Sequence, residues 1–347
     1  MSRRLARSAL AAALFICLPS CFAPAADTAP ATDARAPEAA APGTLASTPR
    51  YTEGRSGPAE LRYIEGIPIL SVMGTPQEMG RQKGILIAEQ VRGISDYPKR
   101  LLKYIGREDQ WPKMVAMAEL LAPQFPVDMA DELRAFAAET DVPRDIGLVG
   151  NTLADTMRGS FACSSLMIEP ARSATGEAIF GRNLDYYAMG ILDKYSLVIV
   201  YHPTGKHAFA SIGFPGLVGC FSGMNDAGLA VAVHEVFVSH DGASLFNAKG
   251  VPYAMAFRRI LEECGSVEEA ARLMDSIPRT TMLNLAVCDP KRAGVIEMTP
   301  KSVVFRGSEQ GICACTNHFR SEKLAVMSLC RRYDTLAETQ SHSKLGV

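Results

Sequence analysis

The sequence has no excess of charge of either sign. It contains 36 lysines and arginines against 37 aspartates and glutamates, a net charge of −1. Proteins that bind nucleic acids or anionic membranes usually carry a basic excess or a basic stripe, and neither occurs after the N-terminal leader, so we expect no nucleic-acid partner. Nine cysteines in 347 residues are also too few for a disulfide scaffold.

The usual hydrolase and nucleotide-binding motifs are missing too. The chain has no Gly-x-Ser-x-Gly elbow, no glycine-rich phosphate loop followed by lysine and serine or threonine, and no His-Glu-x-x-His helix. An enzyme with this sequence therefore needs another nucleophile.

Residues 1–21 have the pattern of an export signal. Three arginines precede an apolar stretch at residues 8–18, which is too short to cross a bilayer as a folded helix. Leu18-Pro19-Ser20-Cys21 resembles a bacterial lipobox, which would place a lipid anchor on Cys21. Ala23-Pro24-Ala25 instead offers ordinary cleavage, which would give a periplasmic or secreted protein. We favour the lipoprotein, but the sequence leaves both open.

Residues 22–56 are rich in Ala, Pro, Thr and Asp and contain almost no large apolar side chains. Such a segment cannot offset its ordering entropy by burial, so we expect a disordered tether and a folded domain at residues 57–347.

The domain is expected to begin mostly helical and to continue mostly as strands. Thr75-Pro76-Gln77-Glu78 has the pattern of a capping box with proline at the first helical position. Further helices are predicted at residues 86–105, 112–122 and 128–140. After residue 161, short β-rich runs are separated by Gly, Pro, Asn and Asp, and helices interrupt them at residues 252–263 and 266–275. This order predicts an α+β fold, an αββα sandwich of two mostly antiparallel sheets covered by helices.

One cysteine stands at the boundary between the two parts. Phe161-Ala162-Cys163-Ser164-Ser165 leads into the first predicted strand of the second part, and Gly181-Arg182-Asn183-Leu184-Asp185 lies on the next one. Thr316-Asn317-His318-Phe319 follows near the end of the chain.

Taken in order, these motifs resemble the N-terminal-nucleophile (Ntn) hydrolases, in particular the isopenicillin N acyltransferase family and its relatives acid ceramidase and choloylglycine hydrolase. The resemblance extends over nearly the whole domain. Further segments that resemble the family pattern are Gly74–Gly80 with Gly84, Asp131–Asn151 and Gly223–Leu229.

The resemblance implies a precursor that cuts the bond between Ala162 and Cys163. Residues 57–162 then form a helical pro-segment, residues 163–347 form the catalytic chain, and the two fragments stay associated. The new α-amine has an ordinary pKa near 7.8 against about 10.4 for lysine, so about 14% is free base at pH 7 compared with about 0.04%. It can accept the thiol proton without a separate histidine.

The resemblance also implies roles for individual residues. Asp185 would hold the α-amine of Cys163, and Arg182 would lie beside the sulfur, where positive charge favours the thiolate. Asn317 would donate its side-chain N–H to the oxyanion of the tetrahedral intermediate.

Two supporting residues are less firmly placed. His234 stands where relatives often carry an asparagine that makes a second oxyanion contact, and a core histidine is an equally good interpretation. Arg332 resembles the late supporting arginine of the family, although the neighbouring Arg331 leaves this assignment open by one position.

Cys313, Cys315 and His318 form a Cys-x-Cys-x-x-His cluster. Structural zinc needs four ligands, usually with a second close pair, and none is evident. We expect neither a metal nor a cofactor, because the thiol, the amine and the oxyanion donors suffice for acyl transfer.

The sequence therefore predicts an exported cysteine Ntn enzyme that hydrolyses linear amides, or transfers their acyl group, through a thioester. Its substrate would be a small N-acyl amide. The alternative is a tethered binding lipoprotein of the same fold that has lost catalysis. The chain ends shortly after Arg332, where relatives continue through a helix and closing strands, so an incomplete C-terminal part is expected and favours this alternative.

Overall fold

The computed structural model describes residues 50–159, 162–326, 329–342 and 344–346. The expected signal, the expected lipidation site Cys21 and most of the expected tether lie outside these residues. Residues Arg50–Val347 form one compact unit. No helix of the described part is long and apolar enough to cross a membrane.

A large sheet runs through this unit in the strand order β1-β2-β3-β6-β7-β8-β9-β10-β11-β12. Neighbouring strands are antiparallel except β3 and β6, which pair in parallel. The strands are β1 (Gly54–Ser56), β2 (Ala59–Ile64), β3 (Ile67–Gly74), β6 (Leu197–Pro203), β7 (Phe209–Gly213), β8 (Ser222–Asn225), β9 (Ala230–Glu235), β10 (Leu283–Cys288), β11 (Ala293–Met298) and β12 (Val303–Gly307).

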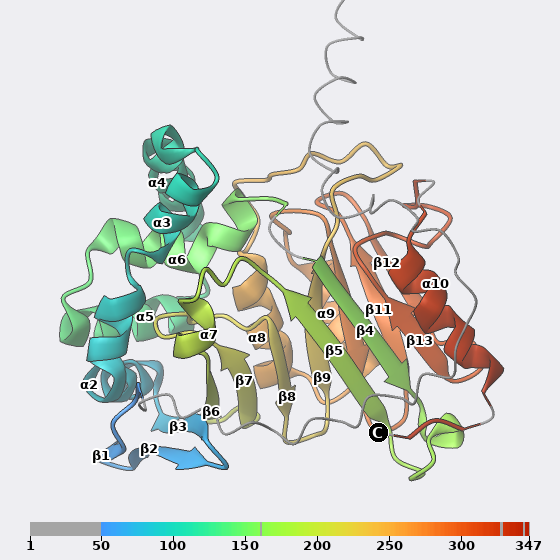
Figure 1. The fold of residues 1–347 in the computed structure, drawn as a ribbon, viewed down its shortest axis with the longest axis horizontal. Helices are drawn as coiled ribbons and strands as arrows, with labels where there is room; N and C mark the ends of the chain where they lie inside the picture. The colour runs from blue at the N-terminus through green and yellow to red at the C-terminus, as the bar shows by residue number, and fades with distance from the viewer. Residues whose placement is uncertain (1–49, 160–161, 327–328, 343, 347) are drawn as a thin grey trace, which may run out of the picture. The chain divides into compact units, whose positions relative to one another are not determined.

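A small antiparallel sheet, in the order β13-β4-β5, lies in front of the large sheet (Figure 1). It contains β4 (Ala162–Ile168), β5 (Ile179–Asp185) and β13 (Ile312–Cys315). Helices α8 (Tyr253–Glu263) and α9 (Val267–Ser276) cover the far face of the large sheet, and α10 (Arg331–Glu338) lies against the small sheet (Figure 1). The predicted αββα sandwich is thus confirmed.

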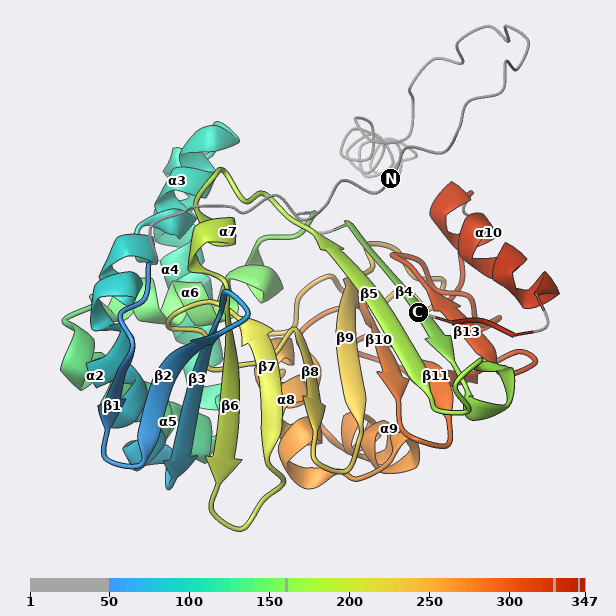
Figure 2. The same ribbon diagram turned by 60° about the horizontal axis from the view of Figure 1, so that its bottom comes forward.

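The remaining helices gather beside β1, β2, β3 and β6 (Figure 2). They are α2 (Pro76–Ile94), α3 (Tyr97–Tyr104), α4 (Trp111–Leu121), α5 (Val127–Thr140), α6 (Arg144–Thr156) and the short α7 (Leu192–Tyr195). Helices α2 and α5 pack so closely that a Cβ atom at Gly80 would overlap the carbonyl oxygen of Glu132, and one at Gly84 would overlap the side chain of Glu139. Gly80 and Gly84 therefore have a packing role.

The expectation of a mostly helical N-terminal third is wrong for residues 54–74, which form β1, β2 and β3. The folded part also begins before residue 57, because Tyr51 is buried and Gly54–Ser56 pairs with β2. Strand β3 is held by parallel pairing with β6, far away in the sequence, and local patterns do not report such a contact.

The capping box is confirmed: Thr75 Oγ1 accepts the N–H of Glu78, and the Glu78 carboxylate accepts the N–H of Thr75. The helix predicted at residues 86–105 is instead the second half of α2 followed by α3. The two are separated at Ser95–Asp96, and α3 then has Pro98 in its first turn, where a missing N–H costs least.

A buried ion network joins the helical part to the large sheet and to α8. Glu132 on α5 is fully buried and pairs with Lys83 on α2 and, at 2.6 Å, with Arg258 on α8. Arg258 also pairs with Glu262 at 2.8 Å, and Glu262 with Lys206 at 2.7 Å. Burial alone would raise the pKa of Glu132, but the charges of Arg258 and Lys83 hold it below its usual value.

We predict that Glu132→Gln lowers the free energy of unfolding by about 3–5 kcal/mol, because it leaves Lys83 buried without its counter-charge. Glu119→Gln removes the exposed pair with Arg144 and is expected to leave the free energy of unfolding nearly unchanged, because solvent screens the pair. Both are measured by urea unfolding in a Cys163→Ala background, in which the expected self-cleavage cannot occur. Equal losses in the two variants would show that the network adds nothing.

Candidate active site

Cys163 is the second residue of β4 and is fully buried between the two sheets. The β4–β5 register places Ala162 opposite Asp185 and Cys163 opposite Leu184. The expected scissile bond therefore lies at the very start of a strand that pairs with β5 along its whole length and with β13 from Ser165 onward.

The thiol of Cys163 is protonated near neutral pH in this uncut chain. Burial raises the pKa of the Cys163 thiol to about 11, even though Arg182 and Asn317 lie within hydrogen-bond reach and lower it. The charge of Glu235 acts against Arg182 and raises the pKa of Cys163 further. The thiol thus needs a base at hand before it can attack.

The backbone of Cys163 is held at both ends. Its N–H donates to Asn317 Oδ1 at 2.8 Å, and its carbonyl oxygen accepts from Arg332 Nη1 at 2.5 Å. Arg332 Nη2 also donates to Asn317 Oδ1 at 3.1 Å. Arg332, in the first turn of α10, is thus the arginine whose side chain reaches the nucleophile.

The structure brings the side chain of Arg182 to the nucleophile, whereas Asp185 lies opposite Ala162, the residue before Cys163. Arg182 donates to the carbonyls of Asn183 and Val233, both at 3.1 Å, which places its charge beside the sulfur. Asp185 is exposed and faces Ala162 across the strand pair. The amine that Asp185 is expected to hold does not exist while the Ala162–Cys163 bond is intact.

His234 is fully buried near Arg182 and Arg332. Burial, together with these cations, lowers the pKa of His234 to about 3, so the imidazole is neutral at any working pH. Its ring nitrogens lie near backbone groups of Ala232 and Ser164 but make no well-aligned hydrogen bond among the described residues. This environment fits a core histidine at least as well as an oxyanion donor.

Glu235 belongs to the site and was missed by the sequence analysis. It is fully buried, its backbone carbonyl accepts from Asn317 Nδ2 at 3.0 Å, and its charge acts on the Cys163 thiol. The available signal was an acidic residue at the end of an otherwise apolar strand, directly after His234.

The Cys-x-Cys-x-x-His cluster is spread over different environments. Cys313 and Cys315 are buried in β13, and Arg306 lies 3.7 Å from the Cys313 sulfur. His318 instead contacts Thr316, at 3.3 Å. Within the described residues no group of three or more potential ligands is arranged to hold a metal ion.

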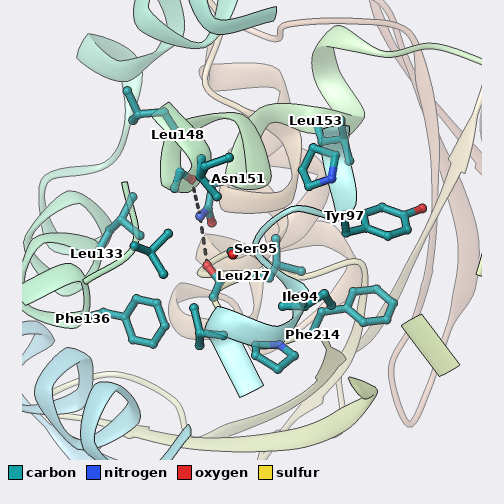
Figure 3. Close-up of a pocket in the computed structure, with 18 of the residues that line it drawn as sticks. Ile94, Ser95, Tyr97, Leu133, Phe136, Leu148, Asn151, Leu153, Phe214 and Leu217 are labelled. Carbon is teal, nitrogen blue, oxygen red and sulfur yellow. Dashed lines mark hydrogen bonds between the residues drawn. The ribbon is translucent and has the colours of Figure 1, made fainter. Parts of the chain in front are cut away.

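An apolar cavity of about 500 Å³ lies between the helical part and the loop at residues 214–218, and Cys163 is not among the residues that line it. Leu133, Phe136 and Leu148 line it from the helical part, and Phe214 and Leu217 from the sheet part (Figure 3). Leu184, whose Cα is opposite that of Cys163, also lines the cavity.

Asn151 is a polar residue in this wall (Figure 3), and its amide is fully engaged. Its Nδ2 donates to the carbonyls of Gly147 and Gly216, both at 3.0 Å, and its Oδ1 accepts the N–H of Val218 at 2.8 Å. Asn151 therefore fixes the loop at residues 214–218 against α6 and leaves a wall suited to an apolar group.

Two stacked, mostly antiparallel sheets between helices, with a cysteine at the start of an inner strand, define the Ntn-hydrolase class. Residues 172–341 match the model of the acyl-coenzyme A:6-aminopenicillanic acid acyl-transferase family. The match confirms the resemblance inferred from the motifs.

Individual relatives are distant. A protein from Archaeoglobus fulgidus is 25% identical over 220 residues, which is 54% of this chain and 37% of that protein. The chain thus spans little more than a third of that relative. Among solved structures, an N-acylethanolamine-hydrolyzing acid amidase ortholog from Caenorhabditis elegans is 18% identical, with a TM-score of 0.38 over 46% of this chain and 72% of that one. A mutant of the conjugated bile acid hydrolase from Clostridium perfringens is 20% identical, with a TM-score of 0.30 over 43% and 52%.

Asp155 anchors the end of α6, shortly before the expected scissile bond. Its Oδ1 accepts the N–H of Tyr253 at 3.1 Å and the hydroxyl of Thr280 at 2.5 Å. Burial raises the pKa of Asp155 to about 7, although these hydrogen bonds and the charge of Arg158 lower it.

A carboxyl whose pKa is raised by folding stabilises the protein below its unfolded pKa and loses that contribution as pH rises through the folded value. We therefore predict that the stability of the wild type relative to Asp155→Asn falls by up to about 4 kcal/mol between pH 4 and pH 7. Urea unfolding of both proteins across this range measures the difference. A constant difference would contradict the raised pKa.

Proposed function

We propose that the protein is an exported cysteine Ntn enzyme. It cuts its own chain between Ala162 and Cys163, and then hydrolyses linear amides of apolar carboxylic acids, or transfers their acyl group, through a thioester on Cys163. The observation that carries the proposal is the position of Cys163. It lies at the start of β4, its backbone is held by Asn317 and Arg332, and Leu184, the residue opposite it on β5, lines the apolar cavity.

Self-cleavage begins with attack of the Cys163 sulfur on the carbonyl carbon of Ala162. The C–N bond breaks, an S–C bond forms, and the thiol proton passes to the nitrogen that becomes the α-amine. Water then hydrolyses this thioester, which releases the Ala162 carboxylate and regenerates the thiol. In the uncut chain the nitrogen of Cys163 is an amide and is no base, so cleavage must precede amidase activity.

In the cut enzyme the α-amine takes the thiol proton as sulfur attacks the acyl carbon of the substrate. Arg182 stabilises the negative charge on sulfur, and Asn317 offers its second Nδ2–H to the oxyanion. The ammonium then gives a proton to the leaving amine, and a thioester remains. Attack by water gives a free acid, whereas attack by another amine gives a new amide.

The cavity supports an apolar acyl group as the part of the substrate that is recognised. Its volume is within the range of small-molecule sites, and each buried methylene contributes about 0.8 kcal/mol of binding. Because the wall comes from residues on both sides of the expected cut, the two fragments must stay together for the site to exist.

We expect the wild-type protein to run as two fragments, one ending at Ala162 and one beginning at Cys163, and Cys163→Ala to remain a single inactive chain. N-terminal sequencing of both fragments identifies the cut, because one of them should begin at Cys163. A fully active wild-type protein that stays in one piece would disprove the mechanism. An uncut wild-type protein without activity would favour the tethered binding protein instead.

The acyl specificity is tested at Gly147 on α6, which lines the cavity and has open space where a Cβ would stand. Gly147→Leu should fill part of the cavity and lower kcat/KM for long-chain N-acyl amides at least about tenfold, while short-chain amides are spared. Gly147→Ala is the matched control and should keep both activities. Equal losses of kcat/KM for long-chain and short-chain amides would show that the cavity does not bind the acyl group.

A further inference from the structure

Helix α10 carries the arginine that reaches the nucleophile, yet hydrophobic burial does not hold this helix in place. None of residues 331–338 is buried, and none belongs to a hydrophobic cluster of the described part of the chain. Most helices in proteins are fixed by the burial of an apolar face against the rest of the fold. The position of α10, and with it that of Arg332, therefore depends on individual polar and aromatic contacts.

One such contact is made by Tyr333, the residue directly after Arg332. The guanidinium carbon of Arg320 lies 3.7 Å from the centroid of the Tyr333 ring. Two nitrogens of Arg320, Nε and Nη2, are buried and have no hydrogen-bond partner among the described residues. A cation is attracted to the face of an aromatic ring, and the attraction is stronger where water is excluded. The ring of Tyr333 is therefore a favourable contact for a charge that is poorly served by hydrogen bonds.

The backbone of Arg320 is held in turn by Glu297, a fully buried carboxylate on β11. Glu297 Oε1 accepts the N–H of Arg320 and Oε2 accepts the N–H of Ser321, both at 2.9 Å. Arg306 on β12 pairs with Glu297 at 3.1 Å and donates to the carbonyl of Ala314 on β13 at 2.8 Å. The segment after β13 is thus tied to both sheets, and the guanidinium of Arg320 stands on a fixed backbone.

We propose that Tyr333 is a positioning residue for Arg332, and that its stack on Arg320 holds α10 where Arg332 meets the backbone of Cys163. Consecutive residues of a helix point about 100° apart, so Tyr333 and Arg332 can face different partners at once. A shift of α10 that released the ring would also carry Arg332 away from the Cys163 carbonyl, to which it donates at 2.5 Å. This inference rests on the proposed function, because the backbone of Cys163 orients the thiol that is proposed to attack.

Amide hydrolysis by two variants of Tyr333 tests this role. Tyr333→Ala removes the stack and should lower kcat about tenfold or more, because the nucleophile loses its alignment. KM should change less than about twofold, since no residue of α10 lines the acyl cavity. Tyr333→Phe is the matched control: it keeps the ring face and should retain kcat within about twofold. Equal losses in the two variants, no loss in either, or a loss confined to KM would overturn the proposal.

A second test does not depend on activity. A helix of eight residues is not stable alone in water, so its amides are protected from hydrogen exchange only while it is docked. In a Cys163→Ala background, Tyr333→Ala should speed the exchange of the α10 amides about tenfold or more, and Tyr333→Phe should not. Unchanged exchange in the Ala variant would overturn the positioning role. Faster exchange in a protein whose wild type neither cuts itself nor hydrolyses amides would support the contact and disprove the proposed function.

Discussion

The pairing of β4 with β5 on one side and β13 on the other fixes the site around Cys163. β5 carries Arg182 and Asp185 at defined positions along β4, and the chain leaves β13 just before Asn317. A slip of one residue of β4 against β5 would change which residues lie opposite Cys163, and a slip of β13 against β4 would displace Asn317 from it. The geometry of the nucleophile is therefore a property of strand register.

The helical part packs against the large sheet and supplies part of the cavity wall. Strand β3 pairs with β6, and the buried carboxylate of Glu132 binds Arg258 of α8, so the part of the chain before Cys163 is built into the core of the unit. The apolar cavity lies between these helices and the loop at residues 214–218, close to Leu184 on β5. Cleavage at Ala162–Cys163 would change the chain's connectivity without removing either wall.

Much of the architecture follows from local sequence patterns. The alternating runs after residue 161 predicted most strands, and the order of short motifs drew attention to Cys163, Arg182 and Asn317, which the structure brings together. The strands at residues 54–74 were missed because β3 is stabilised by a distant parallel partner. Glu235 was missed because a single acidic residue at the end of a strand forms no repeating pattern that would mark it as part of a site. The side chain of Asp185 is exposed, and the α-amine that it is expected to hold would exist only after the proposed cleavage.

The hairpin motif Gly223–Leu229 shows how such motifs divide between structure and chemistry. Asn225 uses both ends of its amide to hold the backbone of Leu229 and of residues at the end of α8, and a Cβ at Gly223 would crowd the carbonyl of Ala210. These residues belong to the fold rather than to the reaction. The chemistry is concentrated instead where β4, β5, β9 and the segment after β13 meet.

The most direct test of the account is the mass of the acylated protein. The processed protein is mixed briefly with an activated ester of a long-chain acid, quenched in acid, and its fragments are weighed. The account predicts one acyl group on the fragment that begins with Cys163, released by hydroxylamine as a thioester is. Acylation of another residue, or of an uncut chain that turns over amides, would contradict it.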